Sequence, residues 1–212
     1  RHEELRARFA QEARAVNRLQ HPGVIAVHDV GLGDDGCPFM VMDLCPGETL
    51  TAVIEKRRKI PGPEAVAQVL PVLLAIDHAH RKGVVHRDLK PSNLMVYRNE
   101  TWDLEVKVLD FGIAKLLGAP AHNPTSTPGE PEDDATQITI SSNGPVGTRQ
   151  YMAPEQWLWV ETDHRADFWA FGVILFRLVT GEHPFGHLEG PAMMYAVAAP
   201  DIPARSVTSA IP

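Results

Sequence analysis

A short polar stretch, "GVVHRDLKPSNLM" from Gly83 to Met95, carries the residue types in this chain that could do chemistry. It brings Asp88, Lys90 and Asn93 close together, with apolar residues on both sides. A carboxylate can accept a proton, a carboxamide oxygen can bind Mg²⁺, and an ammonium group can neutralise a phosphate. The stretch therefore indicates a loop that moves a phosphoryl group. The alternative is a solvated polar turn.

Two further motifs follow this stretch along the chain. "DFG" at 110–112 comes directly after a predicted strand, and "APE" at 153–155 lies beyond a Pro-rich segment. The run "HRDLKPSN" at 86–93 fits the pattern H-R-D-L-x-x-x-N at every specified position. Each tripeptide alone is a weak signal, but chance rarely gives all three in this order. The chain resembles the eukaryotic-type protein kinases over nearly its whole length. "RKGVVHRDLKPSN" and "VGTRQYMAPE" are most similar to the bacterial serine/threonine protein kinases.

The resemblance implies an α+β, bilobal, protein-kinase-like fold across residues 1–212. Residues 1–43 would form a partial small lobe with its helix C and two or three strands. Residues 44–212 would form the hinge and a mostly helical large lobe that lacks its last helices. Residues 118–145 are rich in Pro, Ser, Thr and acidic residues. Such a composition buries little apolar surface, so we expect a mobile insertion in the activation segment.

The resemblance also implies a serine/threonine protein kinase that uses ATP and Mg²⁺. Asp88 would act as the base for the attacking hydroxyl, and Lys90 would contact the transferred phosphate. Asn93 and Asp110 would hold Mg²⁺, and the Thr148 hydroxyl would lie near Asp88 and Lys90. The partners would be proteins with Ser or Thr acceptors.

Nucleotide contacts are implied for a second group of residues. Met42 would be the gatekeeper, Asp43 and Cys45 would belong to the hinge that meets adenine, and Met95 would lie in the nucleotide site. Glu12, in the first helix, would pair with an ATP-binding Lys. The alternative for Glu12 is a solvated carboxylate, since a helix of this composition has several.

Structural roles are implied for residues around the same motifs. His86 and Phe111 would join an apolar column between the lobes, with Gly112 completing the motif. Glu155 would close the activation segment. Asp167 would start a core helix and accept hydrogen bonds from the catalytic-loop backbone, which a simple helix N-cap would also permit. We interpret the neighbouring histidines, His78 and His80, as helix-surface residues.

Regulation is implied by Arg87, which would meet a phosphate on the activation segment. The nearest hydroxyls upstream of residues 147–148 are the candidate acceptors: Thr136, Thr139, Ser141 and Ser142. We expect autophosphorylation within this group, including autophosphorylation in trans.

Hydrophobic periodicity predicts the supporting elements. Helices are expected at 3–20, 49–59, 61–82 and 166–180, strands at 84–85, 94–97 and 106–109, and a hairpin from 24–30 and 39–44. The buried face of the helix at 61–82 is expected to be marked by Val66, Val69, Leu70, Leu73 and Leu74.

Composition excludes several other classes. The 212 residues carry a net charge of −7, which argues against nucleic-acid binding. The longest apolar run has nine residues, too short for a membrane segment, and the first residues do not resemble a secretion signal. The two cysteines do not have the spacing of metal ligands, and we interpret them as free thiols. We expect a cytoplasmic location, either as a cytoplasmic protein or as the cytosolic domain of a membrane-anchored one.

Two parts of the kinase pattern are not found in this sequence: a Gly-rich phosphate loop and a strand Lys. Gly31, Gly33 and Gly36 follow the first helix, so their order is wrong, and Lys56 and Lys59 fall in a later helix. We expect a fragment truncated at both ends that binds Mg-ATP weakly and is itself inactive. The alternative to a kinase is a pseudokinase scaffold, a binding module without phosphotransfer.

Overall fold

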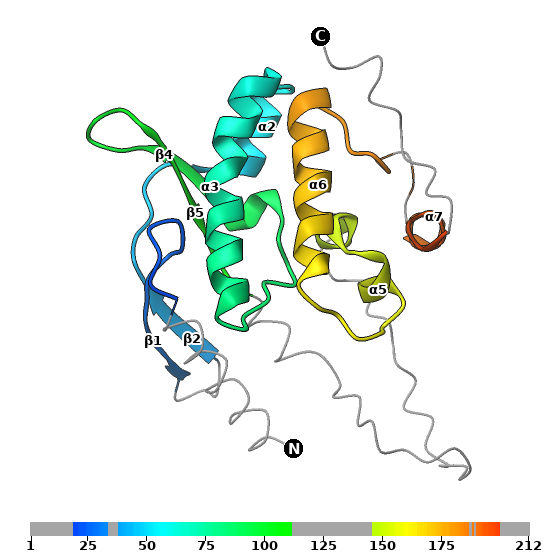
Figure 1. Cartoon of the computed structure of the whole chain (residues 1–212), viewed down its shortest axis with the longest axis horizontal. Coiled ribbons are helices and arrows are strands. Elements are labelled where there is room, and N and C mark those ends of the chain that lie inside the picture. Colours follow the sequence, from blue (N-terminus) through cyan, green and yellow to red (C-terminus); the bar gives the residue numbers. More distant parts are fainter. Residues whose placement is uncertain (1–18, 34–37, 112–145, 187, 189, 200–212) are drawn as a thin grey trace.

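The computed structural model describes residues 19–33, 38–111, 146–186, 188 and 190–199. Two long helices, α3 (Gly62–Arg81) and α6 (Arg165–Thr180), lie side by side at its centre (Figure 1). The shorter helices are α2 (Leu50–Arg57), α5 (Pro154–Trp157) and α7 (Gly190–Ala198), with 3₁₀ turns η1 (Pro91–Asn93) and η2 (Val146–Tyr151). No helix within these ranges is both long and apolar enough to cross a bilayer.

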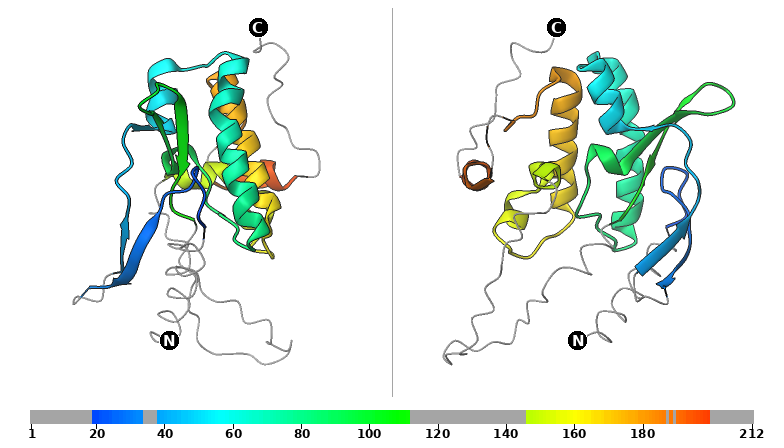
Figure 2. Two further views of the ribbon diagram at one scale, coloured as in Figure 1. Left: turned by 60° about the vertical axis from the view of Figure 1, so that its left-hand side comes forward. Right: turned by 180° about the vertical axis from the view of Figure 1, so that it is seen from behind.

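The strands form two small antiparallel sheets. A hairpin joins β1 (Val27–Leu32) to β2 (Pro38–Met42), as the sequence predicts. A second sheet has the order β3 (Glu48–Thr49), β4 (Leu94–Arg98), β5 (Leu104–Val108) and packs beside α3 (Figure 2). The strand predicted at 84–85 is wrong. That segment is irregular, and Glu48–Thr49 takes the place beside β4 instead.

Local signals set the helix ends. The Thr49 hydroxyl accepts the Ala52 N–H at 3.3 Å and so begins α2. Gly181 has φ +78° and ends α6 in the left-handed conformation that favours glycine. Helix α3 runs through Pro71 to Arg81, within one residue of its predicted end.

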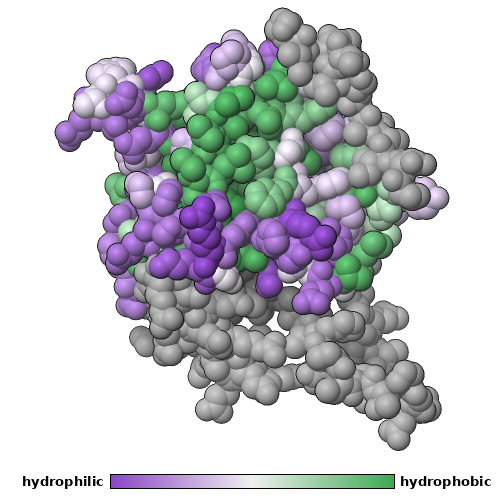
Figure 3. All heavy atoms as spheres, viewed as in Figure 1, coloured by the Kyte–Doolittle hydropathy of each residue, from purple (hydrophilic) through white to green (hydrophobic). Residues whose placement is uncertain are grey.

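In the predicted buried face of α3, Val69 is buried and Leu73 is partly buried, and the prediction is wrong for the other three residues. The helix buries a face that includes Ala65, Val72, Ala75 and Ile76, against β5 and α6. The larger side chains of Val66, Leu70 and Leu74 are about half exposed, one helical turn apart. Figure 3 shows apolar surface over this part of the molecule. The packing of β5 and α6 against the face with Val72 and Ile76 leaves Val66, Leu70 and Leu74 on the opposite side.

His183 joins the segment after α6 to the end of η2. Its Nε2 lies 3.0 Å from the Gln150 carbonyl oxygen and so carries the proton, while its Nδ1 accepts the Phe185 N–H at 3.1 Å. The second contact needs the neutral ring, because a protonated Nδ1 cannot accept, and burial lowers the pKa of His183 to about 4.

This buried histidine predicts acid sensitivity. The unfolded chain takes up the His183 proton near its ordinary pKa of about 6.5, whereas the folded chain resists until about pH 4. Stability is therefore full above about pH 6.5 and falls as the pH drops toward 4. We expect His183 to account for about 3 kcal/mol of the loss in unfolding free energy between pH 7 and 4. Urea unfolding of the parent and His183→Gln at both pH values checks this, because the variant should lose that share. An equal pH dependence in the two proteins would show that His183 is not responsible.

Candidate active site

The three polar residues of the opening stretch form one compact unit. The Lys90 ammonium lies 2.9 Å from Asp88 Oδ2, and both side chains are less than one-fifth exposed. The turn η1 brings Asn93 back toward the start of the loop, where its Nδ2 donates to the Asp88 carbonyl oxygen at 3.0 Å. Asn93 is only 7% exposed. The alternative of a solvated polar turn is therefore wrong.

The metal-ligand candidates lie on adjoining backbone segments. The Leu109 N–H donates to the Asn93 carbonyl oxygen at 2.8 Å, which holds the segment leading to Asp110 against η1. The end of β5 is also held from its other side, because Val108 and the 23–25 segment exchange two backbone hydrogen bonds. Asp110 itself is exposed, with φ +48°. Asn93 Nδ2 is directed to the Asp88 carbonyl oxygen. The other polar atom of the carboxamide, Oδ1, does not take part in that contact.

The side-chain oxygens of Asn93 and Asp110 fit Mg²⁺, which binds oxygen ligands and needs few of them from the protein. Asn93 supplies a carboxamide oxygen and Asp110 an exposed carboxylate, and the Leu109 hydrogen bond keeps their segments together. The two residues are the ones expected to hold the metal.

His86 connects the base to this second segment. Its Nε2 lies 2.9 Å from the Leu109 carbonyl oxygen and therefore donates, so its Nδ1 accepts the Asp88 N–H at 3.2 Å. The ring is completely buried, and burial lowers the pKa of His86, which keeps it neutral. It packs against Phe111 with ring centroids 4.8 Å apart. His86 is thus a packing and hydrogen-bonding residue between the catalytic loop and the segment that carries Leu109 and Phe111.

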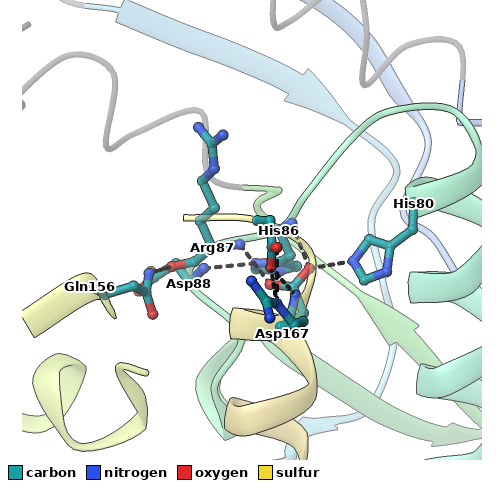
Figure 4. A network of polar contacts seen from close by, with 8 residues as sticks. His80, His86, Arg87, Asp88, Gln156 and Asp167 are labelled. Carbon is teal, nitrogen blue, oxygen red and sulfur yellow. Dashed lines mark hydrogen bonds and ion pairs between the residues drawn. The ribbon is translucent and has the colours of Figure 1, made fainter. Parts of the chain in front are cut away.

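Asp167 anchors the loop to the core. It is 1% exposed, in the first turn of α6, and accepts the His86 N–H on Oδ2 and the Arg87 N–H on Oδ1, both at 2.8 Å (Figure 4). These are the contacts expected of it. The simple N-cap alternative is wrong, since His164 occupies the N-cap position.

The interpretation of the two histidines on α3 is wrong. His80 is half-buried, and its Nε2 lies 2.7 Å from Asp167 Oδ2, so it supports the anchor from the far side (Figure 4). His78 is also partly buried, with its ring 5.1 Å from that of His21. One signal was present in the sequence: His80 follows Ile76, a residue of the true buried face, by one helical turn.

A second residue was missed at the end of the activation segment. Gln156, directly after "APE", donates from Nε2 to the Arg87 carbonyl oxygen at 2.7 Å. No local pattern in the sequence marks it, because its partner is 69 residues away.

The nucleotide-side candidates that the structure describes lie in the two sheets and in the connection between them. Met42 ends β2, and the extended segment 43–46 leads from it toward β3. The Asp43 N–H donates to the Ala26 carbonyl oxygen at 2.9 Å, and its carboxylate lies 2.6 Å from His28 Nε2. Cys45 is half-buried, and burial raises the pKa of its thiol. Met95 lies half-buried in β4. This is a connection of the kind a hinge requires, and nucleotide contact by these residues stays a prediction.

Several expected site residues lie outside what the structure describes. They are Glu12, Gly112, Thr136, Thr139, Ser141 and Ser142, together with the 118–145 insertion. Thr148 belongs to η2, where only its backbone is described. Glu155 is half-buried in α5.

Comparisons with known proteins point to one family. A family model described as protein kinase domain matches residues 1–206. The chain is 40% identical over 179 residues to serine/threonine-protein kinase pkn3 of Myxococcus xanthus, covering 84% of this chain and 30% of that protein. It is 37% identical over 193 residues to serine/threonine-protein kinase PknF of Mycobacterium tuberculosis, covering 90% and 37%. The chain thus covers 30% of the length of the first of these relatives and 37% of the length of the second.

Solved structures give the same fold. A crystal structure of the PknI kinase domain of Mycobacterium tuberculosis, a double mutant, matches with a TM-score of 0.63 at 28% identity, over 94% of this chain and 66% of that one. The prediction of a partial bilobal kinase fold is confirmed. The chain belongs to the protein kinase domain family.

Proposed function

We propose that the protein carrying this chain is a serine/threonine protein kinase, which transfers the γ-phosphoryl group of ATP to Ser and Thr hydroxyls of proteins. The observation that carries this proposal is the unit of Asp88, Lys90 and Asn93, joined by the Leu109 hydrogen bond to the segment of Asp110. Transfer needs an aligned hydroxyl and cancelled phosphate charge, and these residue types supply both.

Each residue of the unit has a distinct part in the proposed reaction. Asp88 accepts the proton of the attacking hydroxyl through its carboxylate, which the Lys90 contact orients. Lys90 also places its ammonium where a transferred phosphate needs a positive partner. Asn93 holds the Asp88 backbone in place and, with Asp110, would bind Mg²⁺. The metal supplies charge neutralisation to the phosphates when bound.

The nucleotide and regulatory assignments belong to the same proposal. Met42, Asp43, Cys45, Met95 and Glu12 are proposed to bind ATP. The Thr148 hydroxyl is proposed to act beside Asp88. Arg87 is proposed to meet a phosphate on the activation segment, placed on one of its hydroxyls by autophosphorylation. A cytoplasmic location also stays a prediction.

Phosphoamino-acid analysis of the full-length protein tests the function. It is incubated with Mg²⁺, γ-labelled ATP and a protein rich in Ser and Thr. We expect label on phosphoserine or phosphothreonine of the acceptor, and on the protein itself within residues 136–142. No transfer, with partner proteins still bound, would establish the pseudokinase scaffold instead. Label on the protein only outside 136–142 would contradict the regulatory assignment alone.

A further inference from the structure

We infer that Gln156 is a positioning residue for the transfer step: its side-chain amide fixes the peptide group that precedes Asp88. This inference rests on the proposed function, because it gives Asp88 the role of base. Gln156 itself lies on α5, and its side chain donates to the catalytic loop (residues 86–93) at the backbone carbonyl oxygen of Arg87 (Figure 4).

The orientation of the Gln156 amide is fixed by two contacts. Its Oε1 accepts the Ala153 N–H at 3.0 Å, at the start of α5, and its Nε2 donates to the Arg87 carbonyl oxygen at 2.7 Å. A backbone N–H can only donate and a carbonyl can only accept, so the amide has one arrangement that satisfies both. Gln156 thus joins the beginning of α5 to the catalytic loop.

The peptide group that Gln156 holds follows a residue in a strained backbone conformation. Arg87 has φ +61°, a left-handed conformation that costs a non-glycine residue about 1 kcal/mol or more. Its N–H is bound by Asp167 Oδ1 and its carbonyl oxygen by Gln156 Nε2, so both of its backbone polar groups are held. The next N–H, that of Asp88, donates to His86 Nδ1.

These contacts together set the direction of Asp88. The Arg87 carbonyl and the Asp88 N–H belong to one planar peptide group, and Gln156 and His86 hold its two polar atoms. Rotation of that plane would swing the Asp88 carboxylate away from the attacking hydroxyl. Small misplacements of this kind can cost up to about 10²-fold in rate.

The same contact makes the loop dependent on α5. Helix α5 follows η2, and the amide reaches back from it to Arg87. If α5 moves away, the Arg87 carbonyl loses its donor and the peptide loses one of its supports. A displacement of α5 would in this way change the orientation of Asp88.

Two substitutions in the full-length protein separate this role from simple helix capping. Gln156→Glu keeps an oxygen for the Ala153 N–H but places a carboxylate against the Arg87 carbonyl oxygen. Gln156→Ala removes both contacts and lets water donate to that oxygen. Positioning predicts that kcat falls in the order parent, Ala, Glu, with Glu about 10-fold or more below the parent. Capping alone predicts that Glu stays near the parent and Ala is the weakest.

The measurement is steady-state phosphotransfer with the KM for ATP and the melting temperature of each variant. We expect the KM for ATP to stay within about two-fold, since the contacts of Gln156 are with the catalytic loop and its own helix. Gln20→Glu is the matched control, because it makes the same change on an exposed residue and should behave as the parent. A Gln156→Glu enzyme with the parent kcat, or with the loss in KM alone, would overturn the inference. If Gln156→Glu failed to fold, Gln156→Ala would still test the inference: a lower kcat at the parent melting temperature would support it, because loss of a cap acts through stability, and the parent kcat would overturn it.

Asp88→Asn, measured in parallel, separates the two levels of the proposal. An inactive Asp88→Asn beside a fully active Gln156→Glu would overturn only the role of Gln156. An Asp88→Asn as fast as the parent would overturn the base assignment and this inference with it.

Discussion

Asp88→Asn is expected to lower kcat for phosphotransfer by about 10³-fold, within the usual range for removal of a general base. The substitution keeps the shape of the side chain and leaves an oxygen for the Lys90 ammonium. It also leaves the backbone contact from Asn93, which goes to the carbonyl oxygen of residue 88 and not to its side chain. The loss should therefore come from the missing proton acceptor and not from a displaced loop.

Steady-state transfer by the full-length protein, with the melting temperature as a check on folding, measures this effect. Asp77→Asn is the control, because Asp77 is an exposed carboxylate on α3 that pairs with Arg81 one turn away. We expect the control to match the parent. A kcat for Asp88→Asn within about three-fold of the parent would show that Asp88 is not the base.

Asp167→Ala is expected to lower both stability and activity. Two backbone N–H groups, those of His86 and Arg87, would lose their acceptor in a site that is almost closed to water. Each such loss costs about 1–3 kcal/mol, so we expect about 4 kcal/mol less unfolding free energy. His80 would lose its partner as well. The loosened Arg87 peptide should lower kcat by about 10²-fold in the protein that remains folded.

Urea unfolding and transfer assays on the same preparation test both parts. Asp167→Asn should be less damaging than Asp167→Ala, since its one remaining oxygen can still accept one of the two N–H groups. Asp77→Ala is the matched control and should change the unfolding free energy by less than about 1 kcal/mol. A loss below about 1 kcal/mol for Asp167→Ala would mean that the loop is held by other contacts.

Sequence reasoning reached the catalytic loop because its residue types are close together in the chain. The order of "HRD", "DFG" and "APE" predicts the family, and local signals at Thr49 and Gly181 mark helix ends correctly. The roles of Asp88, Asn93 and Asp110 stay predictions, although the structure brings their segments together.

The orientation of α3 could not be predicted in the same way. Its sequence offers two apolar faces, one that carries Leu70 and Leu74 and one that carries Val72 and Ile76. Both have helical spacing, and the packing of β5 and α6 selects the second one. Periodicity alone does not distinguish the two faces, which is why that prediction failed.

The missed residues share a different cause. His80 meets Asp167 from 87 positions away, and Gln156 meets Arg87 from 69 positions away. Each contact depends on how α3, α5 and α6 pack around the loop, which a single sequence without solved coordinates does not specify. The two-residue strand β3 is likewise too short for any alternation to reveal it.

Single-turnover transfer from Mg-ATP tests the central claim most directly, in the full-length parent and in Asp110→Asn. The account predicts that the parent labels Ser or Thr only when Mg²⁺ is present. It predicts a rate about 10³-fold lower for folded Asp110→Asn, because the carboxylate proposed to hold the metal is gone. Equal rates for the two proteins, or transfer by the parent after Mg²⁺ is removed, would contradict the assignment of this site.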